Sequence, residues 1–387
     1  MQNASSDSKY RTIRPAFTET TPTEHMRETI DIHCNEGTCS RIAIGSVEED
    51  FASMLPEDSP RVIIVTDARV HSNNLAFINS YERIVIGQGE SSKTLVKVEE
   101  VYRQLLAMGA DRSTFIVGMG GGIVSDITGF AASTYMRGVR FAFVPTTLLA
   151  QVDASIGGKN GVNLDGYKNI IGVFRQPEFV LCDPSLLSSL PDREFRAGLA
   201  EVIKAGIIGD PTLFELLERH TFEDLRGNDE LLRDAIVRAI KVKTAIVERD
   251  ECEHGERRKL NLGHTFAHAM EKSFTNLSHG EAVAAGMAII CDAANRKGIL
   301  DTATCDRIKA VIGKMGLPLE YPVEMRKLLS LIRSDKKREG SGIYLVFPKS
   351  IGDCIVEKTA TDRLEEMFPG NRPTETSSVE SESENME

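Results

Sequence analysis

The sequence predicts an α/β N-terminal nucleotide-binding domain followed by an all-α C-terminal metal-binding domain. Between about residues 30 and 190, short β-branched runs alternate with segments that carry apolar residues at helical spacing. This alternation is typical of a largely parallel sheet covered by helices. Beyond residue 190 the strand pattern nearly disappears, and helical segments follow one another, separated by Gly, Pro or Asn. We therefore expect two domains with a cleft between them.

In the first half, six apolar runs predict strands, and residues 95–109 predict a helix among them. Ligands in folds of this class gather at the carboxyl ends of the strands. The strand runs cover residues 41–46, 61–67, 83–89, 114–122, 140–147 and 179–183.

In the second half, apolar residues recur at helical spacing in six segments. A late pair of runs, residues 343–349 and 353–358, predicts a small hairpin. The helical segments cover residues 193–207, 229–247, 264–274, 280–297, 305–316 and 325–333.

The two ends of the chain differ in composition from its body. Residues 1–26 are polar and rich in Ser and Thr, and residues 371–387 are rich in Glu. Both compositions are typical of disordered segments, and the acidic residues of the first argue against a transit peptide. We expect the α/β domain over residues 27–190 and the mainly helical metal and substrate domain over residues 191–370.

Composition excludes several function classes. With 387 residues, 41% of them hydrophobic, the chain can bury a large core, and it has no apolar run long enough to span a membrane. Seven cysteines without a CxxC pair indicate reduced thiols and a cytoplasmic protein. The net charge of −11 argues against nucleic acid as a partner. An anionic ligand would therefore need a local basic pocket.

A glycine cluster at residues 118 and 120–122 lies between a predicted strand and a predicted helix. Glycines there let the main chain approach a pyrophosphate, and the helix N-terminus favours the negative charge. Ile123 stands where the GxGxxG pattern needs its last glycine, so this is not an ordinary Rossmann loop. The alternative is a tight strand-to-helix turn without a ligand. Asp67, Glu90 and Lys93 are candidate cofactor contacts, although each alone could be a solvated loop charge.

Acidic and histidine residues in three blocks of the second half predict a metal site. His264 and His268 are four residues apart, so spacing alone favours both as ligands, but the motif HTFAH lacks the Glu of HExxH. Glu201 and Lys204 could be a surface ion pair. Glu201 lies within an apolar run, however, and His279 directly precedes another, where a charge is costly unless it is paired or metal-bound. One carboxylate and two imidazoles leave an open coordination position, which is typical of a catalytic metal.

Further cations and amides lie in loops or beside glycines and predict the basic pocket. Such groups suit a phosphate and a carboxylate on one small substrate, although any one of the lysines could be a surface residue. They are Arg137, Lys159, Lys168, Asn169, Lys243, Arg257 and Lys336, together with the carboxylate Asp153 in the run QVDASIGGKNG.

Taken together, these motifs resemble those of the 3-dehydroquinate synthase family, which belongs to the sugar phosphate cyclase superfamily. The matching runs include MGGGIVSDITGFAASTYMRG, QVDASIGGKNG, YKNIIG, GLAEVIKAG, LNLGHTFAHAMEKS, LSHGEAVAAGM and DKK. They occur in the family's order over about residues 40–357.

The resemblance implies roles for individual residues. Zinc, or cobalt, would be bound by Glu201, His264 and His279, and His268 becomes a substrate or proton-transfer residue rather than a ligand. NAD would lie near Asp67, Glu90, Lys93, Gly121, Gly122, Asp126, Thr146, Thr147, Lys159, Lys168 and Ser189. The substrate pocket would contain Arg137, Asp153, Lys159, Lys168, Asn169, Lys204, Lys243, Arg257, Asn261, His268 and Lys336.

The resemblance also implies a reaction. In this family 3-deoxy-arabino-heptulosonate 7-phosphate becomes 3-dehydroquinate and phosphate, by transient oxidation with NAD, β-elimination of phosphate, re-reduction and aldol closure. That step belongs to the shikimate pathway of aromatic amino acid biosynthesis. We accordingly expect a cytoplasmic homodimer that acts on a small sugar phosphate, with no nucleic-acid or membrane partner.

Three alternatives remain open. Related cyclases act on sedoheptulose 7-phosphate, but Asn261 and Lys336 match the pattern of dehydroquinate synthases. An iron-type NAD-dependent alcohol dehydrogenase shares the two-domain plan, but the QVDASIGGK and DKK segments argue against it. A binding module without activity would lack bound metal. The chain departs from the family at Asn160, which is commonly Thr, and in GYKN at residues 166–169, so we expect an altered substrate loop.

Overall fold

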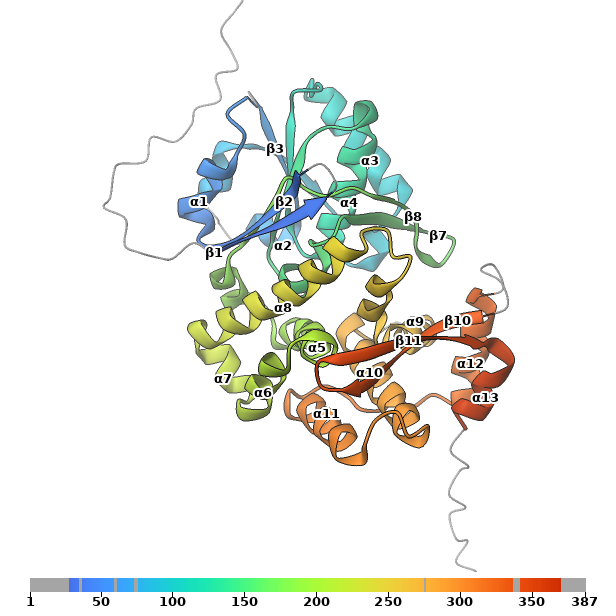
Figure 1. The fold of residues 1–387 in the computed structure, drawn as a ribbon. Helices are drawn as coiled ribbons and strands as arrows, with labels where there is room; N and C mark the ends of the chain where they lie inside the picture. The colour runs from blue at the N-terminus through green and yellow to red at the C-terminus, as the bar shows by residue number, and fades with distance from the viewer. Residues whose placement is uncertain are drawn as a thin grey trace, which may run out of the picture.

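The computed structural model describes residues 28–34, 37–58, 61–72, 76–274, 276–336 and 342–369. The expected extensions, residues 1–26 and 371–387, lie outside this part of the chain. The described residues form an α/β region and a mainly helical region, drawn in the upper and lower halves of Figure 1. This arrangement confirms the predicted fold class.

A seven-stranded sheet organises the α/β region, in the order β1-β2-β9-β6-β5-β3-β4. Neighbouring strands pair in parallel, except that β1 pairs antiparallel with β2 at one edge. Six of the strands coincide with the predicted runs, and β1 is an addition to them. The bounds are β1 Glu28–Cys34, β2 Gly37–Ile44, β3 Val62–Asp67, β4 Glu82–Ile86, β5 Phe115–Gly120, β6 Phe141–Pro145 and β9 Phe179–Cys182.

Both faces of this sheet are covered. On β5, Ile116 packs into one hydrophobic cluster while Phe115 and Val117 pack into another, because successive side chains of a strand point to opposite faces. Helices α3 and α4 supply residues to the first cluster, and α1 supplies Phe51 to the second. Burial on both faces explains why the strands read as continuous apolar runs. These helices are α1 Val47–Met54, α3 Leu95–Ala107 and α4 Gly122–Thr134.

A second, two-stranded sheet was not predicted. It consists of β7 (Lys159–Leu164) and β8 (Tyr167–Phe174), which pair antiparallel. The two residues between them, Asp165 and Gly166, have φ of 50° and 78°, the left-handed conformation that an Asp-Gly hairpin turn requires. The Asp-Gly pair was therefore a signal for this hairpin, hidden among glycines and charged residues.

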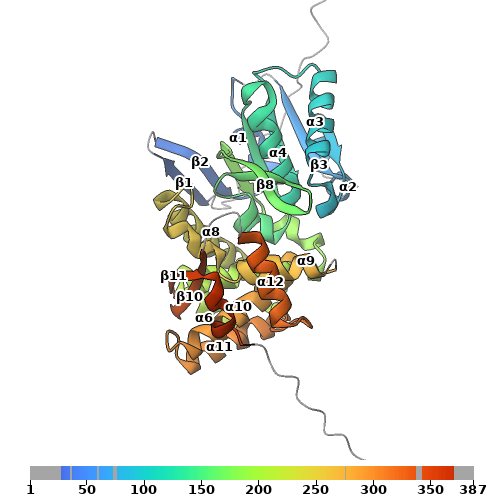
Figure 2. The same cartoon turned by 90° about the vertical axis from the view of Figure 1, so that its right-hand side faces the viewer.

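The second half contains the predicted helices and hairpin, with further short helices. Among the described residues, no helix combines the length and apolarity that crossing a membrane requires. Figure 2 shows this region beneath the α/β region from a second direction. The elements are α5 Asp192–Gly209, α6 Pro211–Arg219, α7 Phe222–Gly227, α8 Asp229–Arg249, α9 His264–Ser273, α10 His279–Arg296, α11 Thr302–Lys314, α12 Met325–Lys336, β10 Gly342–Ser350, β11 Asp353–Ala360 and α13 Leu364–Met367.

One expectation about the cysteines is wrong. Cys39 takes part in a disulfide bond, so the thiols are not all reduced. The cysteines at 182, 252, 291, 305 and 354 are free, and all of these except Cys252 are buried.

Candidate active site

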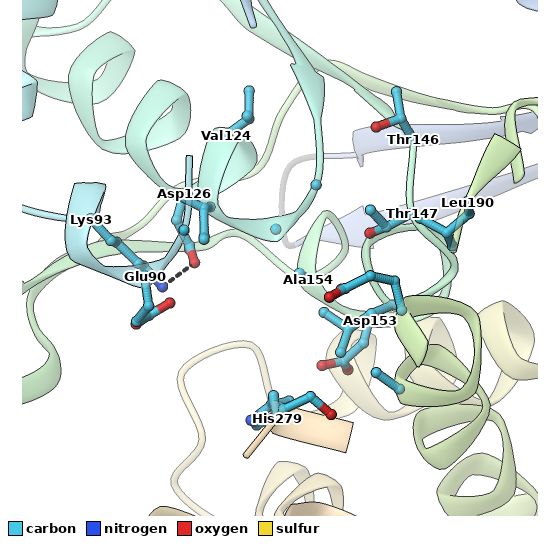
Figure 3. Close-up of a pocket in the computed structure, with 18 of the residues that line it drawn as sticks. Glu90, Lys93, Val124, Asp126, Thr146, Thr147, Asp153, Ala154, Leu190 and His279 are labelled. Atoms are coloured by element: carbon cyan, nitrogen blue, oxygen red, sulfur yellow. Dashed lines mark hydrogen bonds and ion pairs between the residues drawn. The ribbon is translucent and has the colours of Figure 1, made fainter. Parts of the chain in front are cut away.

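A cavity of about 1170 Å³ lies where the carboxyl ends of the strands meet the helical region. Asp67 at the end of β3, Gly121 after β5 and Thr146 after β6 line it from the α/β region, and Lys204 and His264 line it from the helical region. Side chains of the two regions point into this space from opposite sides in Figure 3. The cavity thus occupies the position that ligands take in folds of this class.

Close packing of three helices builds the helical side of the cavity. Gly263, which precedes α9, has φ of 79°, and a Cβ there would lie 2.7 Å from the carbonyl oxygen of Val283 in α10. At Gly280, near the start of α10, a Cβ would lie 2.2 Å from the carbonyl oxygen of Ala197 in α5. These glycines therefore let the first turns of α9 and α10 approach each other and α5.

The first residues of α9 and α10 meet a residue of α5. Ligand atoms of Glu201, His264 and His279 all lie within 4.8 Å of one another. The Nε2 atoms of His264 and His279 are 3.7 Å and 3.5 Å from Oε1 of Glu201. Spacing alone favoured His268 as a ligand, but it lines the cavity outside this cluster, with its ring centroid 5.8 Å from that of His264.

The cluster is suited to a divalent metal ion. Glu201 is buried, and neither carboxylate oxygen has a hydrogen-bond partner of good geometry among the described residues, although Lys204 forms an ion pair with one of them. A buried carboxylate beside two imidazoles is a donor set that Zn²⁺ accepts, with a fourth position free. The carboxylate and the two imidazoles therefore fit the divalent metal ion that the sequence predicted.

The protonation behaviour of the cluster reflects burial among charges. Burial opposes ionisation of Glu201, but the charges of Lys204 and the two imidazoles outweigh it and hold its pKa well below the usual value. Burial and the charge of Lys204 lower the pKa of His264 to about 3. Burial also disfavours the cation at His279, but the nearby carboxylates of Glu201 and Glu271 outweigh it and raise its pKa to about 9. The two imidazoles thus differ, since only His279 has carboxylates on both sides.

Buried lysines lie beside the cluster around one carboxylate. Nζ of Lys243 is 2.5 Å from Oδ1 of Asp153, and Nζ of Lys204 is 3.9 Å from the same oxygen. Burial lowers the pKa of Lys243 to about 8, against the opposing charge of Asp153. Burial disfavours ionisation of Asp153, but the two lysines lower its pKa. This arrangement is a local basic pocket of the kind that a net acidic protein needs for an anionic ligand.

A loop carboxylate that sequence reasoning missed also reaches the cavity residues. Glu253 forms an ion pair with Lys159 and accepts a hydrogen bond from Nδ2 of Asn261. It has φ of 62°, which is uncommon for a side chain of this size. Arg257 is fully buried nearby and donates to the carbonyl oxygens of Gly157, at 2.6 Å, and Glu251. A single acid in a charged loop carries no sequence signal for such a position.

On the α/β side, main-chain geometry shapes the cavity. Helix α4 begins at Gly122, where a Cβ would lie 2.9 Å from Cβ of Ala154. Lys93 forms an ion pair with Asp126, shown in Figure 3, and burial raises the pKa of Asp126 despite that charge. Oδ1 of Asp67 accepts hydrogen bonds from the amides of Arg69 and Val70. The glycines thus form a tight strand-to-helix turn. The same turn lines the cavity, as a pyrophosphate-binding loop would have to.

Nearly all the predicted cofactor and substrate residues line the cavity. They are Asp67, Glu90, Lys93, Gly121, Gly122, Asp126, Thr146, Thr147, Asp153, Lys159, Lys168, Asn169, Ser189, Lys204, Lys243, Arg257, Asn261 and His268. Arg137 is not among the lining residues; it lies in an exposed turn after α4, with φ of 69°. Lys336 ends α12, and its side chain lies outside the described part of the structure.

Asn160, at a position where the resemblance predicted an altered substrate loop, belongs to β7 and is not among the residues that line the cavity. It is buried, and Nδ2 donates to the carbonyl oxygens of Gly158, at 3.0 Å, and Arg175, at 2.8 Å. A Cβ at Gly129 of α4 would lie 1.9 Å from its Oδ1, so the side chain faces α4. Asn160 therefore ties the start of β7 to the end of β8.

Comparisons with known proteins agree with this geometry. The family model described as 3-dehydroquinate synthase N-terminal matches residues 83–197, and the one described as 3-dehydroquinate synthase C-terminal matches residues 198–338. The chain is 45% identical over 276 residues to the 3-dehydroquinate synthase of Nitrosospira multiformis, covering 70% of this chain and 75% of that one. It is 39% identical over 336 residues to the enzyme of Pelobacter propionicus, covering 86% and 90%.

Among solved structures, the fold is similar to that of ValA, a 2-epi-5-epi-valiolone synthase from Streptomyces hygroscopicus with NAD⁺ and Zn²⁺ bound. The TM-score is 0.77 at 29% identity, and the match covers 84% of this chain and 94% of that one.

Proposed function

The chain belongs to the 3-dehydroquinate synthase family, and on that premise we propose that it converts 3-deoxy-arabino-heptulosonate 7-phosphate into 3-dehydroquinate and phosphate. It is a carbon-oxygen lyase that uses NAD and a divalent metal ion, Zn²⁺ or Co²⁺. One observation supports this most directly: the cluster of Glu201, His264 and His279 lies at the cavity that the glycine turn and five lysines also line.

In this proposal Glu201, His264 and His279 would hold the metal, and residues at the strand ends and the glycine turn would hold NAD. When bound, the metal ion makes a substrate hydroxyl more acidic, and NAD takes up a hydride and returns it. The chain's own residues orient the substrate so that the hydroxyl and the phosphate reach these two groups together. Enclosure between the two regions limits contact with water.

The lysines have the role of holding a phosphate dianion. Asp153 fixes Lys243 and Lys204 at the metal side, and Lys159, the first residue of β7, lines the same cavity. Their charges stabilise the phosphate as it leaves, and they keep its oxygen within reach of the adjacent C–H proton. The resemblance makes Arg257 and Lys336 the proposed partners of the substrate carboxylate. In this proposal the substrate's own phosphate is the base that removes the C–H proton in the elimination step.

Purified protein with NAD⁺ and Zn²⁺ tests this function. We expect phosphate release from 3-deoxy-arabino-heptulosonate 7-phosphate with no net accumulation of NADH, because each hydride is returned. Faster turnover of sedoheptulose 7-phosphate would instead assign the chain to another cyclase reaction. Net NADH formation from an alcohol would assign it to the iron-type dehydrogenases.

A cytoplasmic homodimer is part of the same proposal. It rests on the family resemblance, and light scattering on the purified chain measures the mass in solution. A monomeric mass at micromolar concentration would contradict the dimer.

A further inference from the structure

We propose that Glu271 is a positioning residue for the metal site, which holds His279 in the orientation that presents Nε2 to the metal. The proposal rests on the proposed function, because it takes His279 as a ligand. Sequence reasoning did not single out Glu271, which lies within the run HTFAHAMEKS. It is on α9, seven residues after His264, and therefore on the same face of that helix two turns later.

Glu271 and Glu201 contact opposite nitrogens of the His279 ring. Its Oε1 is 3.0 Å from Nδ1 of His279, and the other ring nitrogen of His279 is 3.5 Å from Oε1 of Glu201. If Nδ1 carries the proton that Glu271 accepts, the lone pair of Nε2 is directed at the metal position. A hydrogen bond from the second ring nitrogen to a carboxylate fixes the tautomer and the ring orientation of metal-bound histidines.

The two imidazoles of the cluster are oriented by different means. Nδ1 of His264 lies 3.1 Å from the carbonyl oxygen of Leu262, which is two residues away in the chain. Nδ1 of His279 instead contacts a side chain of a neighbouring helix. The orientation of His264 is therefore local and set by the main chain. That of His279 depends on one carboxylate, which a single substitution can remove.

Glu271 is buried between two polar partners. Its side chain is only 4% exposed, and Nζ of Lys168, from β8, lies 3.0 Å from the same Oε1 that contacts His279. A buried carboxylate without such partners would be costly. The same oxygen also joins the hairpin of the α/β region to the metal side of the cavity.

Metal affinity, measured without catalysis, tests the proposal. Wild type and Glu271→Gln are stripped with a chelator, and Zn²⁺ binding is measured by competition with a coloured chelator. We expect Glu271→Gln to bind Zn²⁺ roughly 10- to 100-fold more weakly, which is the usual effect of losing such a partner. The absorption spectrum of the Co²⁺-loaded protein should change in the same variant, and Glu271→Asp should recover part of the affinity. Circular dichroism checks that both variants are folded.

Two controls separate orientation from other effects. Glu281→Gln removes a carboxylate at the start of the same helix α10, where it closes a capping box with Ser278 and pairs with Arg193 but does not contact the ring. It should lower the melting temperature and leave Zn²⁺ affinity unchanged. Lys168→Met removes the hairpin contact and should change Zn²⁺ affinity less than about threefold.

Equal Zn²⁺ affinity of Glu271→Gln and wild type would overturn the inference while leaving the proposed function intact. A loss in Lys168→Met as large as that in Glu271→Gln would overturn it too, because Glu271 would then act by anchoring the hairpin. If wild type itself bound no divalent metal, the proposed function would fail first, and the inference with it.

Discussion

The two sides of the cavity are built in different ways. The α/β side is formed by strand ends, by a glycine turn at Gly121 and Gly122, and by side chains such as Asp67 and Thr146. On the helical side, the functional groups of the metal cluster come from three different helices. The glycine turn leaves room for a ligand because it has no side chains. The metal position depends on which side chains are present.

This contrast makes opposite substitutions informative. Adding one carbon to the glycine turn should weaken NAD⁺ binding and leave metal binding intact. Removing one imidazole should abolish metal binding and leave NAD⁺ binding intact. If both kinds of substitution abolished both kinds of binding, the two sides would not be independent.

His264→Ala is the change with the largest expected effect. Loss of one of three protein ligands should remove the metal and lower the rate of phosphate release by on the order of a thousandfold or more. NAD⁺ binding should persist, because the glycine turn is untouched. Metal analysis, calorimetry with NAD⁺ and a phosphate assay measure the three quantities. His33→Ala is the control, since His33 is exposed and its Nδ1 lies 2.8 Å from Oε1 of Glu248, which is not among the residues that line the cavity. Full activity in metal-free His264→Ala would refute the ligand assignment.

Gly122→Ala should have a smaller effect on the opposite side. Its Cβ would lie 2.9 Å from Cβ of Ala154, and such crowding costs about 1–3 kcal/mol. We expect about tenfold weaker binding of NAD⁺ with unchanged Zn²⁺ affinity, measured by calorimetry.

Gly313→Ala is the matched control for this substitution. Gly313 lies exposed in the last turn of α11, and an added Cβ would have no atom within 4 Å apart from those of its own helix, so the substitution should stabilise the fold by at most about 1 kcal/mol. Unimpaired NAD⁺ binding by Gly122→Ala would show that the turn does not hold the cofactor.

Lys243→Arg gives the smallest effect and sharpens the contrast within the helical side. The pKa of Lys243 is lowered to about 8, so its cation is present below that pH and is lost above it. If this cation holds the phosphate, kcat/KM of wild type should decline as pH rises through about 8. Arg stays charged, and Lys243→Arg should lose that decline even though its larger side chain lowers the rate. Lys241→Arg, an exposed position on the same helix, should keep the wild-type profile. A decline unchanged in Lys243→Arg would assign it to another group.

Much of the fold could be predicted because its signals are local. The apolar runs that became β3 and β5 and the periodic segment that became α8 carry their patterns within a few residues of each other. The hairpin of β7 and β8 was not predicted, because glycines and charged residues interrupt its alternation of apolar and polar residues. Asp165 and Gly166 nevertheless marked its turn. The edge strand β1 was also not predicted, although Ile30 and Ile32 alternate with polar residues in it.

Site residues followed a different rule. Residues in recognisable runs, such as His264 and Lys204, could be proposed from sequence, and they line the cavity. Glu253, in a charged loop, and Glu271, within the run HTFAHAMEKS, were not proposed, because the sequence around each does not show which residues it contacts in the fold. The resemblance placed Arg137 in the substrate pocket, yet it does not line the cavity of its own chain.

By itself, the sequence determined the order of strands and helices, the two-region plan and the chemical types available to the site, because periodicity and turn residues act over short distances along the chain. Only the tertiary structure decided which side chains meet. Contacts between α5, α9 and α10 depend on how closely their backbones approach, and that approach is set by the missing side chains of Gly263 and Gly280. That packing makes His279, rather than His268, the second imidazole beside Glu201.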